Sequence, residues 1–319
     1  MTFSSKATPR WRQAVAGLVC TAALALLASC GGGTSQYETF VPGRVFAFGD
    51  ESSTLTPAGQ RYGVNGLNTD TGLLDCTLNP LWVQSVAALY GFAFAECNPS
   101  SLSVPQARMY ATAGAKVADV AAQVEGQVAS GGFRSNDLAL ILAGTNDVLD
   151  LYAQYPVRPE ASLIEDAKER GLRMAQVVNR LVNLGAKVIV SNLPDTGLSP
   201  FAGAEKAGNT DTDRAAMISR LVAAFNEQLG ANVILDGRYV GLMQADLRTQ
   251  AAQRSPGSFG LTNVTTAVCT VPLPNCSTST LVPDATATAY LWADATHLAP
   301  GGQNILASLA VDRARRNPF

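Results

Sequence analysis

His297 is the only histidine among the 319 residues of the chain, and its imidazole could serve as a general base. Asp294 lies about one helical turn before it, so the two side chains can face the same side of a turn. Imidazole titrates near neutrality and can take the proton from an attacking hydroxyl, while a neighbouring carboxylate orients the ring. This pair therefore predicts a proton-transfer site, although the same spacing also suits an ordinary polar turn before a last helix.

Three other short segments combine glycine with polar side chains. Gly-Asp-Glu-Ser at 49–52 and Gly-Thr-Asn-Asp at 144–147 each follow an apolar run, and Gly114 lies in a turn of small residues. Each segment alone could be an ordinary turn or helix cap. Ligands of parallel sheets bind outside the carboxyl ends of the strands, so we expect the segments to converge on one rim. Their N–H groups could hold a developing oxyanion there.

Short apolar strands alternate with longer amphipathic helices along most of the chain. We predict strands at 44–48, 137–143, 187–191 and 232–236, and helices at 81–90, 117–128, 161–184, 213–229 and 303–315. Such alternation is typical of a parallel sheet with helices on both faces. The sequence therefore predicts a three-layer α/β/α sandwich with a mainly parallel central sheet. Residues 255–290, rich in Ser, Thr, Pro and Asn, are expected to form a long excursion.

The order of these segments resembles the SGNH, or GDSL-type, esterase and lipase superfamily. Phe-Gly-Asp at 48–50 matches its first block, the turn around Gly114 its second, residues 144–147 its third, and Asp-Ala-Thr-His at 294–297 its fifth. Asn-Leu-Pro-Asp at 192–195 and Phe-Asn at 225–226 resemble connecting segments of its lipase-like branch. The resemblance implies a flavodoxin-like SGNH hydrolase fold and hydrolysis of carboxylic esters without a cofactor. It also implies that His297 is the base, Asp294 its acid, and Gly114 and Asn146 the oxyanion donors.

The nucleophile block departs from the family pattern at Glu51, where the family has serine. Three alternatives are open. A shifted turn could make Ser52 the nucleophile, which is our working hypothesis for a Ser-His-Asp esterase. Glu51 could itself attack, with water assisted by His297 releasing the intermediate. Finally, the site could be catalytically degenerate, in an envelope protein that binds a glycan, lipid or protein partner. Met109 is a smaller departure, since the family often has asparagine there.

Residues 1–30 have the pattern of a bacterial lipoprotein signal peptide. A basic start precedes an apolar run at 14–28, and Leu-Ala-Ser-Cys at 27–30 resembles a lipobox; a plain secretory signal cleaved nearby is the alternative. Cys30 is the predicted lipidation site, 31–43 a flexible tether, and 44–319 a single hydrolase-like domain. The resemblance implies export and a membrane anchor. Gly32 favours the outer membrane of a Gram-negative bacterium, because no acidic residue stands at that position.

Four cysteines follow the predicted anchor, and an even number in an exported chain predicts disulfide bonds. Of the three possible pairings we favour Cys76–Cys97 and Cys269–Cys276, because each closes a local loop around Pro/Asn-rich turns. No zinc site is expected, since the chain has no Cys-x-x-Cys and His297 has no histidine partner. The chain has 23 basic and 25 acidic residues, and the basic residues form no block. This argues against binding of nucleic acid. The predicted partners are therefore an ester substrate, small or lipid, and a membrane.

Overall fold

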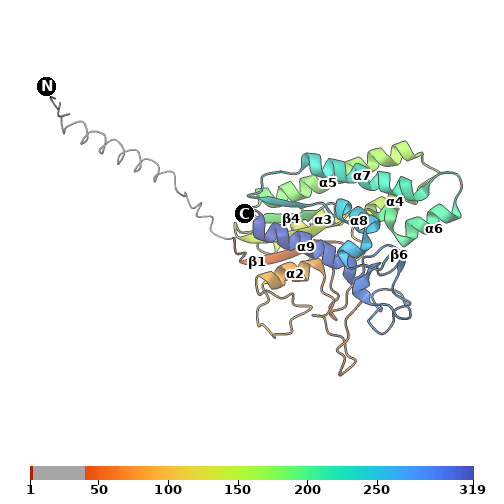
Figure 1. The fold of residues 1–319 in the computed structure, drawn as a ribbon, viewed down its shortest axis with the longest axis horizontal. Helices are drawn as coiled ribbons and strands as arrows, with labels where there is room; N and C mark the ends of the chain where they lie inside the picture. Colours follow the sequence, from red (N-terminus) through yellow and green to blue (C-terminus); the bar gives the residue numbers. More distant parts are fainter. Residues whose placement is uncertain (3–39) are drawn as a thin grey trace. The chain divides into compact units, whose positions relative to one another are not determined.

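Five parallel strands form the central sheet, in the order β2-β1-β3-β4-β5. Helices lie on both sides of this sheet (Figure 1). Their bounds are β1 Arg44–Gly49, β2 Ala107–Met109, β3 Asp137–Leu142, β4 Lys187–Ser191 and β5 Val240–Met243. The central strand β3 is buried along its whole length, as is expected where helices cover both faces of a sheet. The predicted α/β architecture with a parallel sheet is therefore confirmed.

The computed structural model describes Met1, Thr2 and residues 40–319. The predicted signal peptide, the lipidation site at Cys30 and residues 31–39 of the predicted tether lie outside the described residues. Within the described part of the chain, no helix combines the length and the hydropathy needed to cross a bilayer.

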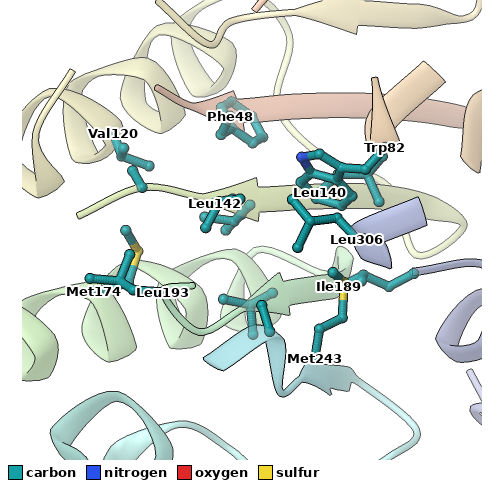
Figure 2. Packing of buried hydrophobic residues seen from close by; sticks show 14 of the residues in the cluster. Phe48, Trp82, Val120, Leu140, Leu142, Met174, Ile189, Leu193, Met243 and Leu306 are labelled. Carbon is teal, nitrogen blue, oxygen red and sulfur yellow. The ribbon is translucent and has the colours of Figure 1, made fainter. Parts of the chain in front are cut away.

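The helices pack in two groups around the sheet. Helices α2 (Trp82–Leu89) and α9 (Pro300–Arg316) pack against each other, and α5 (Glu160–Asn183) packs against both α3 (Val117–Ala129) and α7 (Arg214–Asn232). Buried side chains from both groups, including Trp82, Leu306, Val120 and Met174, join the strand residues in one hydrophobic cluster (Figure 2). Shorter helices connect these elements: α4 (Thr145–Tyr152), η2 (Thr196–Leu198), α6 (Pro200–Gly208) and α8 (Ala245–Arg254).

The predicted strand at 232–236 is wrong. Helix α7 continues to Asn232, and the fifth strand of the sheet is Val240–Met243. The reason is a side chain from α5: the Asn179 amide donates to the carbonyl of Asn232 and accepts from the backbone N–H of Ile234. These bonds hold the chain in a turn, so the apolar pair after the helix packs inward without joining the sheet.

The expected excursion at 255–290 has some regular structure of its own. It contains η3 (Pro256–Phe259), β6 (Asn263–Ala267) and η4 (Ala287–Ala289), and β6 pairs in parallel with β7 (Tyr290–Trp292). The disulfide Cys269–Cys276 lies within it, and Cys76–Cys97 joins the loops on either side of α2. Both predicted pairings are therefore confirmed. Strand β7 leads directly into the turn that carries His297.

The contact between α5 and α7 gives a test of the fold. A Cβ added at Gly171 in α5 would lie 2.1 Å from the Phe225 carbonyl oxygen in α7, whereas one at Gly126 in α3 would meet nothing within 4 Å. Alanine favours a helix over glycine by about 1 kcal/mol, but overpacking a helix contact costs about 1–3 kcal/mol. We expect Gly171→Ala to lower the melting temperature and Gly126→Ala to leave it unchanged or raise it. Equal effects in thermal denaturation would contradict this packing.

Candidate active site

The candidate site lies at the rim where the central strands β1 and β3 end. Glu51 follows β1, Asn146 opens α4 after β3, and His297 lies in the loop between β7 and α9. Gly49 makes the first of these turns possible, with a φ of +135° and a position where a Cβ would lie 2.0 Å from the Leu142 carbonyl oxygen. Gly114 precedes α3 and completes the rim. The sheet thus brings together four segments that are far apart in sequence.

The carboxylate of Glu51 is the point where these segments meet. Its Oε2 accepts hydrogen bonds from the Gly114 backbone N–H at 2.7 Å and from Asn146 Nδ2 at 3.0 Å. Its Oε1 lies 3.2 Å from His297 Nε2 and 3.1 Å from Asn146 Nδ2. The side chain is only 9% exposed. The residues predicted to hold an oxyanion therefore hold an oxygen of the protein itself.

Asp294 orients the imidazole from the other side. Its Oδ2 lies 2.8 Å from His297 Nδ1, and its Oδ1 accepts the backbone N–H groups of Thr296 and His297. The same carboxylate thus fixes both the ring and the turn that carries it. With Nδ1–H directed at Asp294, the opposite ring nitrogen faces Glu51.

The pKa values of the site follow from these contacts. Burial lowers the pKa of His297, but the hydrogen bonds and charges of Asp294 and Glu51 outweigh it and raise the pKa to about 10. Burial raises the pKa of Glu51, but hydrogen bonds from His297, Gly114 and Asn146 bring it below its usual value. At neutral pH the His297 side chain is therefore an imidazolium between the carboxylates of Asp294 and Glu51. Such an imidazolium can donate a proton, and it becomes a base only after losing one.

Asp50 precedes Glu51 and is fully buried. Burial and the nearby charge of Glu51 raise its pKa to about 7. Its Oδ1 accepts the backbone N–H of Ser52, while its Oδ2 has no hydrogen-bond partner. Asp147 has a similar supporting position, since it accepts the N–H of Val117 and pairs with Arg170. Neither aspartate contacts His297 by a hydrogen bond.

The serines that follow Glu51 are held by other partners. The carbonyl of Ser52 accepts a hydrogen bond from the Gln303 side chain, and the Ser53 hydroxyl accepts one from the Trp82 indole. Among the described residues, the Ser52 hydroxyl makes no hydrogen bond to His297. Gln303 was not predicted from the sequence; its side chain also accepts the backbone N–H of Trp82 and so ties α2 and α9 to the turn. No local pattern marks such a residue in α9.

The space beside Glu51 is small. A cavity of about 20 Å³ is lined by Glu51, Ser52, Thr145, Pro194, Thr196, Trp292, Thr296, His297 and Leu298. This is room for roughly one water-sized molecule. A larger cavity of about 570 Å³ runs along α9, beside α8 and η3. It shares no lining residue with the small cavity beside Glu51. In the described residues, no group of three His, Cys, Asp or Glu side chains could hold a metal ion.

The single histidine allows a direct test of these charges. We expect the imidazole resonances of His297 in NMR to titrate with a pKa near 10, and at a lower pKa in Glu51→Gln, where one carboxylate is removed. Because folding raises the pKa of His297, its protonation stabilises the folded state. This contribution to the free energy of unfolding is complete below the unfolded pKa of about 6.5 and is lost as pH rises through about 10. Titration of the native protein near 6.5 would contradict the pair of carboxylate contacts.

The solved structures similar to this chain include a lipase from a goat rumen metagenome, with 12% identity, a TM-score of 0.47, and coverage of 86% of this chain and 99% of that one. An acetyl xylan esterase has 15% identity, a TM-score of 0.43, and coverage of 83% and 96%. A lipolytic G-D-S-L family protein from Veillonella parvula has 14% identity, a TM-score of 0.41, and coverage of 84% and 96%.

No curated protein matches the chain. The family model is more decisive, because it matches residues 45–310, from the first strand of the sheet into the last helix. The chain therefore belongs to the GDSL-like lipase/acylhydrolase family.

Proposed function

We propose that this protein hydrolyses ester bonds and that Glu51 replaces the family's serine as the covalent catalyst. One observation carries the proposal: the Glu51 carboxylate contacts both predicted oxyanion donors and the imidazole of His297. The Ser52 hydroxyl makes none of these hydrogen bonds. A carboxylate can act as a nucleophile when a neighbouring group later directs water at the intermediate.

In the first step Glu51 Oε1 attacks the acyl carbon of the ester and displaces the alcohol oxygen. The departing alkoxide takes the proton of the His297 imidazolium, which lies 3.2 Å from the attacking oxygen. The products of this step are the alcohol, a mixed anhydride on Glu51 and a neutral imidazole. The raised pKa of His297 serves this step, because it keeps the proton in place until an alkoxide appears.

In the second step water attacks Cδ of Glu51, and neutral His297 takes one proton from it. The oxyanion then forms on Oε2, where Gly114 and Asn146 already donate. Each such donor is worth about 3–4 kcal/mol in comparable hydrolases. Collapse of the tetrahedral intermediate releases the carboxylate product. One proton goes to solvent, and the Glu51 carboxylate and His297 imidazolium are restored.

A second function, binding without turnover, is favoured by the hydrogen-bonded state of Glu51 itself. A carboxylate with bonds to three residues, beside a cavity of about 20 Å³, is stable without any substrate. In that case the family's site would be filled permanently by its own side chain. The two functions differ in whether an activated ester is turned over.

The test uses hydrolysis of p-nitrophenyl acetate by the native protein and three variants. We expect Glu51→Gln to reduce turnover to background, and His297→Ala to reduce it by roughly 10²–10⁴-fold because the acid and base are lost. Ser52→Ala is the matched control for the neighbouring position and is expected to keep its turnover. Loss of turnover in Ser52→Ala, with turnover retained in Glu51→Gln, would show that Ser52 is the nucleophile. Absence of turnover in the native protein would support binding.

We also propose that the chain is exported and anchored by a lipid on Cys30, on the strength of the lipobox pattern at 27–30. In a Gram-negative host grown with radiolabelled palmitate, the native chain should become labelled and Cys30→Ser should not. Autoradiography of the immunoprecipitated protein measures this. Equal labelling of the variant would contradict lipid attachment at this residue.

A further inference from the structure

The oxyanion donors of this site face an atom of the protein, which limits what they can do for a substrate. The hydrogen bonds of Gly114 N–H and Asn146 Nδ2 end on Oε2 of Glu51. An acyl substrate attacked by Oε1 would develop its negative charge on a different oxygen, outside the reach of occupied donors. The donors therefore stabilise the release of an intermediate from Glu51, and they give no help to its formation from an acyl group.

We propose that Glu51 also attacks saturated carbon, so that the site hydrolyses small molecules in which such a carbon carries a leaving group that departs as an anion, such as a halide. This inference rests on the nucleophilic role of Glu51 in the proposed function and extends its substrate class. Displacement at a saturated carbon forms no oxyanion, so the first step needs no free oxyanion hole. Attack on an acyl carbon, as in the proposed function, proceeds without these donors in its first step, whereas attack on a saturated carbon does not need them.

The bonds and charges balance over two steps. Oε1 forms a bond to the saturated carbon while the bond to the leaving group breaks, and the electron pair leaves with the anion. Glu51 is then an alkyl ester whose carbonyl oxygen is Oε2. The imidazolium first loses its proton to solvent, and water then adds to Cδ while neutral His297 accepts one proton from it. Collapse expels the alkoxide, which takes that proton from His297. The Glu51 carboxyl that remains gives its proton to His297, which restores the carboxylate and the imidazolium. The net reaction converts the halide and water to an alcohol, a halide ion and a proton.

The second step of this sequence is the family's own chemistry applied to an ester on the chain. The ester carbonyl lies in the hole formed by Gly114 and Asn146, and the His297 imidazole stands beside the bond to be broken. Alkylation also removes the negative charge of Glu51, one of the two carboxylate charges that raise the pKa of His297. The imidazolium can then release its proton to solvent and become the base that the water attack requires.

The cavity limits the size of the substrate. Its volume of about 20 Å³ beside Glu51 and His297 is room for roughly one water-sized molecule, so only the reacting carbon of a substrate fits there and the rest of a short chain must lie outside it. Its lining residues include Trp292 and Leu298, whose apolar side chains suit an alkyl group, together with Thr145 and Thr296. A short primary alkyl halide is therefore the best probe.

The experiment uses n-propyl bromide and traps the covalent intermediate. In His297→Gln the alkyl ester should form and persist, because no base activates water. Peptide mass spectrometry should find one propyl group on Glu51 in most of the protein. Asp294→Asn is the second trapping variant, in case His297→Gln folds poorly. The native protein should release bromide continuously. Glu51→Gln should release no bromide and gain no propyl group. Exposed carboxylates such as Glu165, in the same digest, report non-specific alkylation.

The outcomes separate this inference from the proposed function. If hydrolysis of p-nitrophenyl acetate depends on Glu51 but neither trapping variant gains a propyl group, attack at saturated carbon is wrong and the ester hydrolase stands. If no Glu51-dependent turnover occurs with either substrate, both are wrong. A propyl group on Ser52, or equal labelling of Glu165 and Glu51, would also overturn the inference.

Discussion

The hydrogen-bonded contact between the Glu51 carboxylate and the His297 imidazolium is the interaction on which the site depends. A carboxylate that is 9% exposed is costly to ionise unless charges and donors compensate it. Here His297 supplies the charge, and Gly114 and Asn146 supply N–H donors. Removing one partner of such a buried pair typically costs roughly 3–5 kcal/mol, because the other charge is left alone. The site is thus stable as it stands, and its chemistry must begin from a charged pair.

The rest of the fold holds this pair in place. Parallel strands β1 and β3 end at the same rim, and the glycine that ends β1 lets the chain turn closely over the end of β3. Gln303 reaches from α9 to the carbonyl of Ser52, so the helix that follows the histidine turn also fixes the turn that carries Glu51. Asp294 then sets the ring orientation. The Glu51 carboxylate, the donors and the imidazole are therefore all held next to the ends of strands and helices, which is the preorganisation that the proposed catalysis requires.

Much of this arrangement could be predicted because its signals are local. Apolar runs ended by glycine and polar residues locate the strands, and parallel strands must end at one rim, so the proximity of Glu51, Gly114 and Asn146 follows from the pattern. The place of His297 beside them was implied by the family resemblance, because β7, which precedes it, is not part of the central sheet. Which of Glu51 and Ser52 contacts His297 could not be predicted. It depends on the direction of a single turn, which is set by Asp50 and by Gln303, a residue 251 positions away. The missed end of α7 has a similar cause, since Asn179 of α5 determines it.

The central claim is that water attacks Cδ of Glu51, and turnover in water labelled with heavy oxygen tests it most directly. The native protein hydrolyses p-nitrophenyl acetate in that water, and the peptide that contains Glu51 is then weighed by mass spectrometry. Our account predicts that Glu51 acquires heavy oxygen during turnover and that the product of the first turnover carries an ordinary oxygen from Glu51. Turnover with no label in Glu51, and with all of it in the released product, would contradict the account.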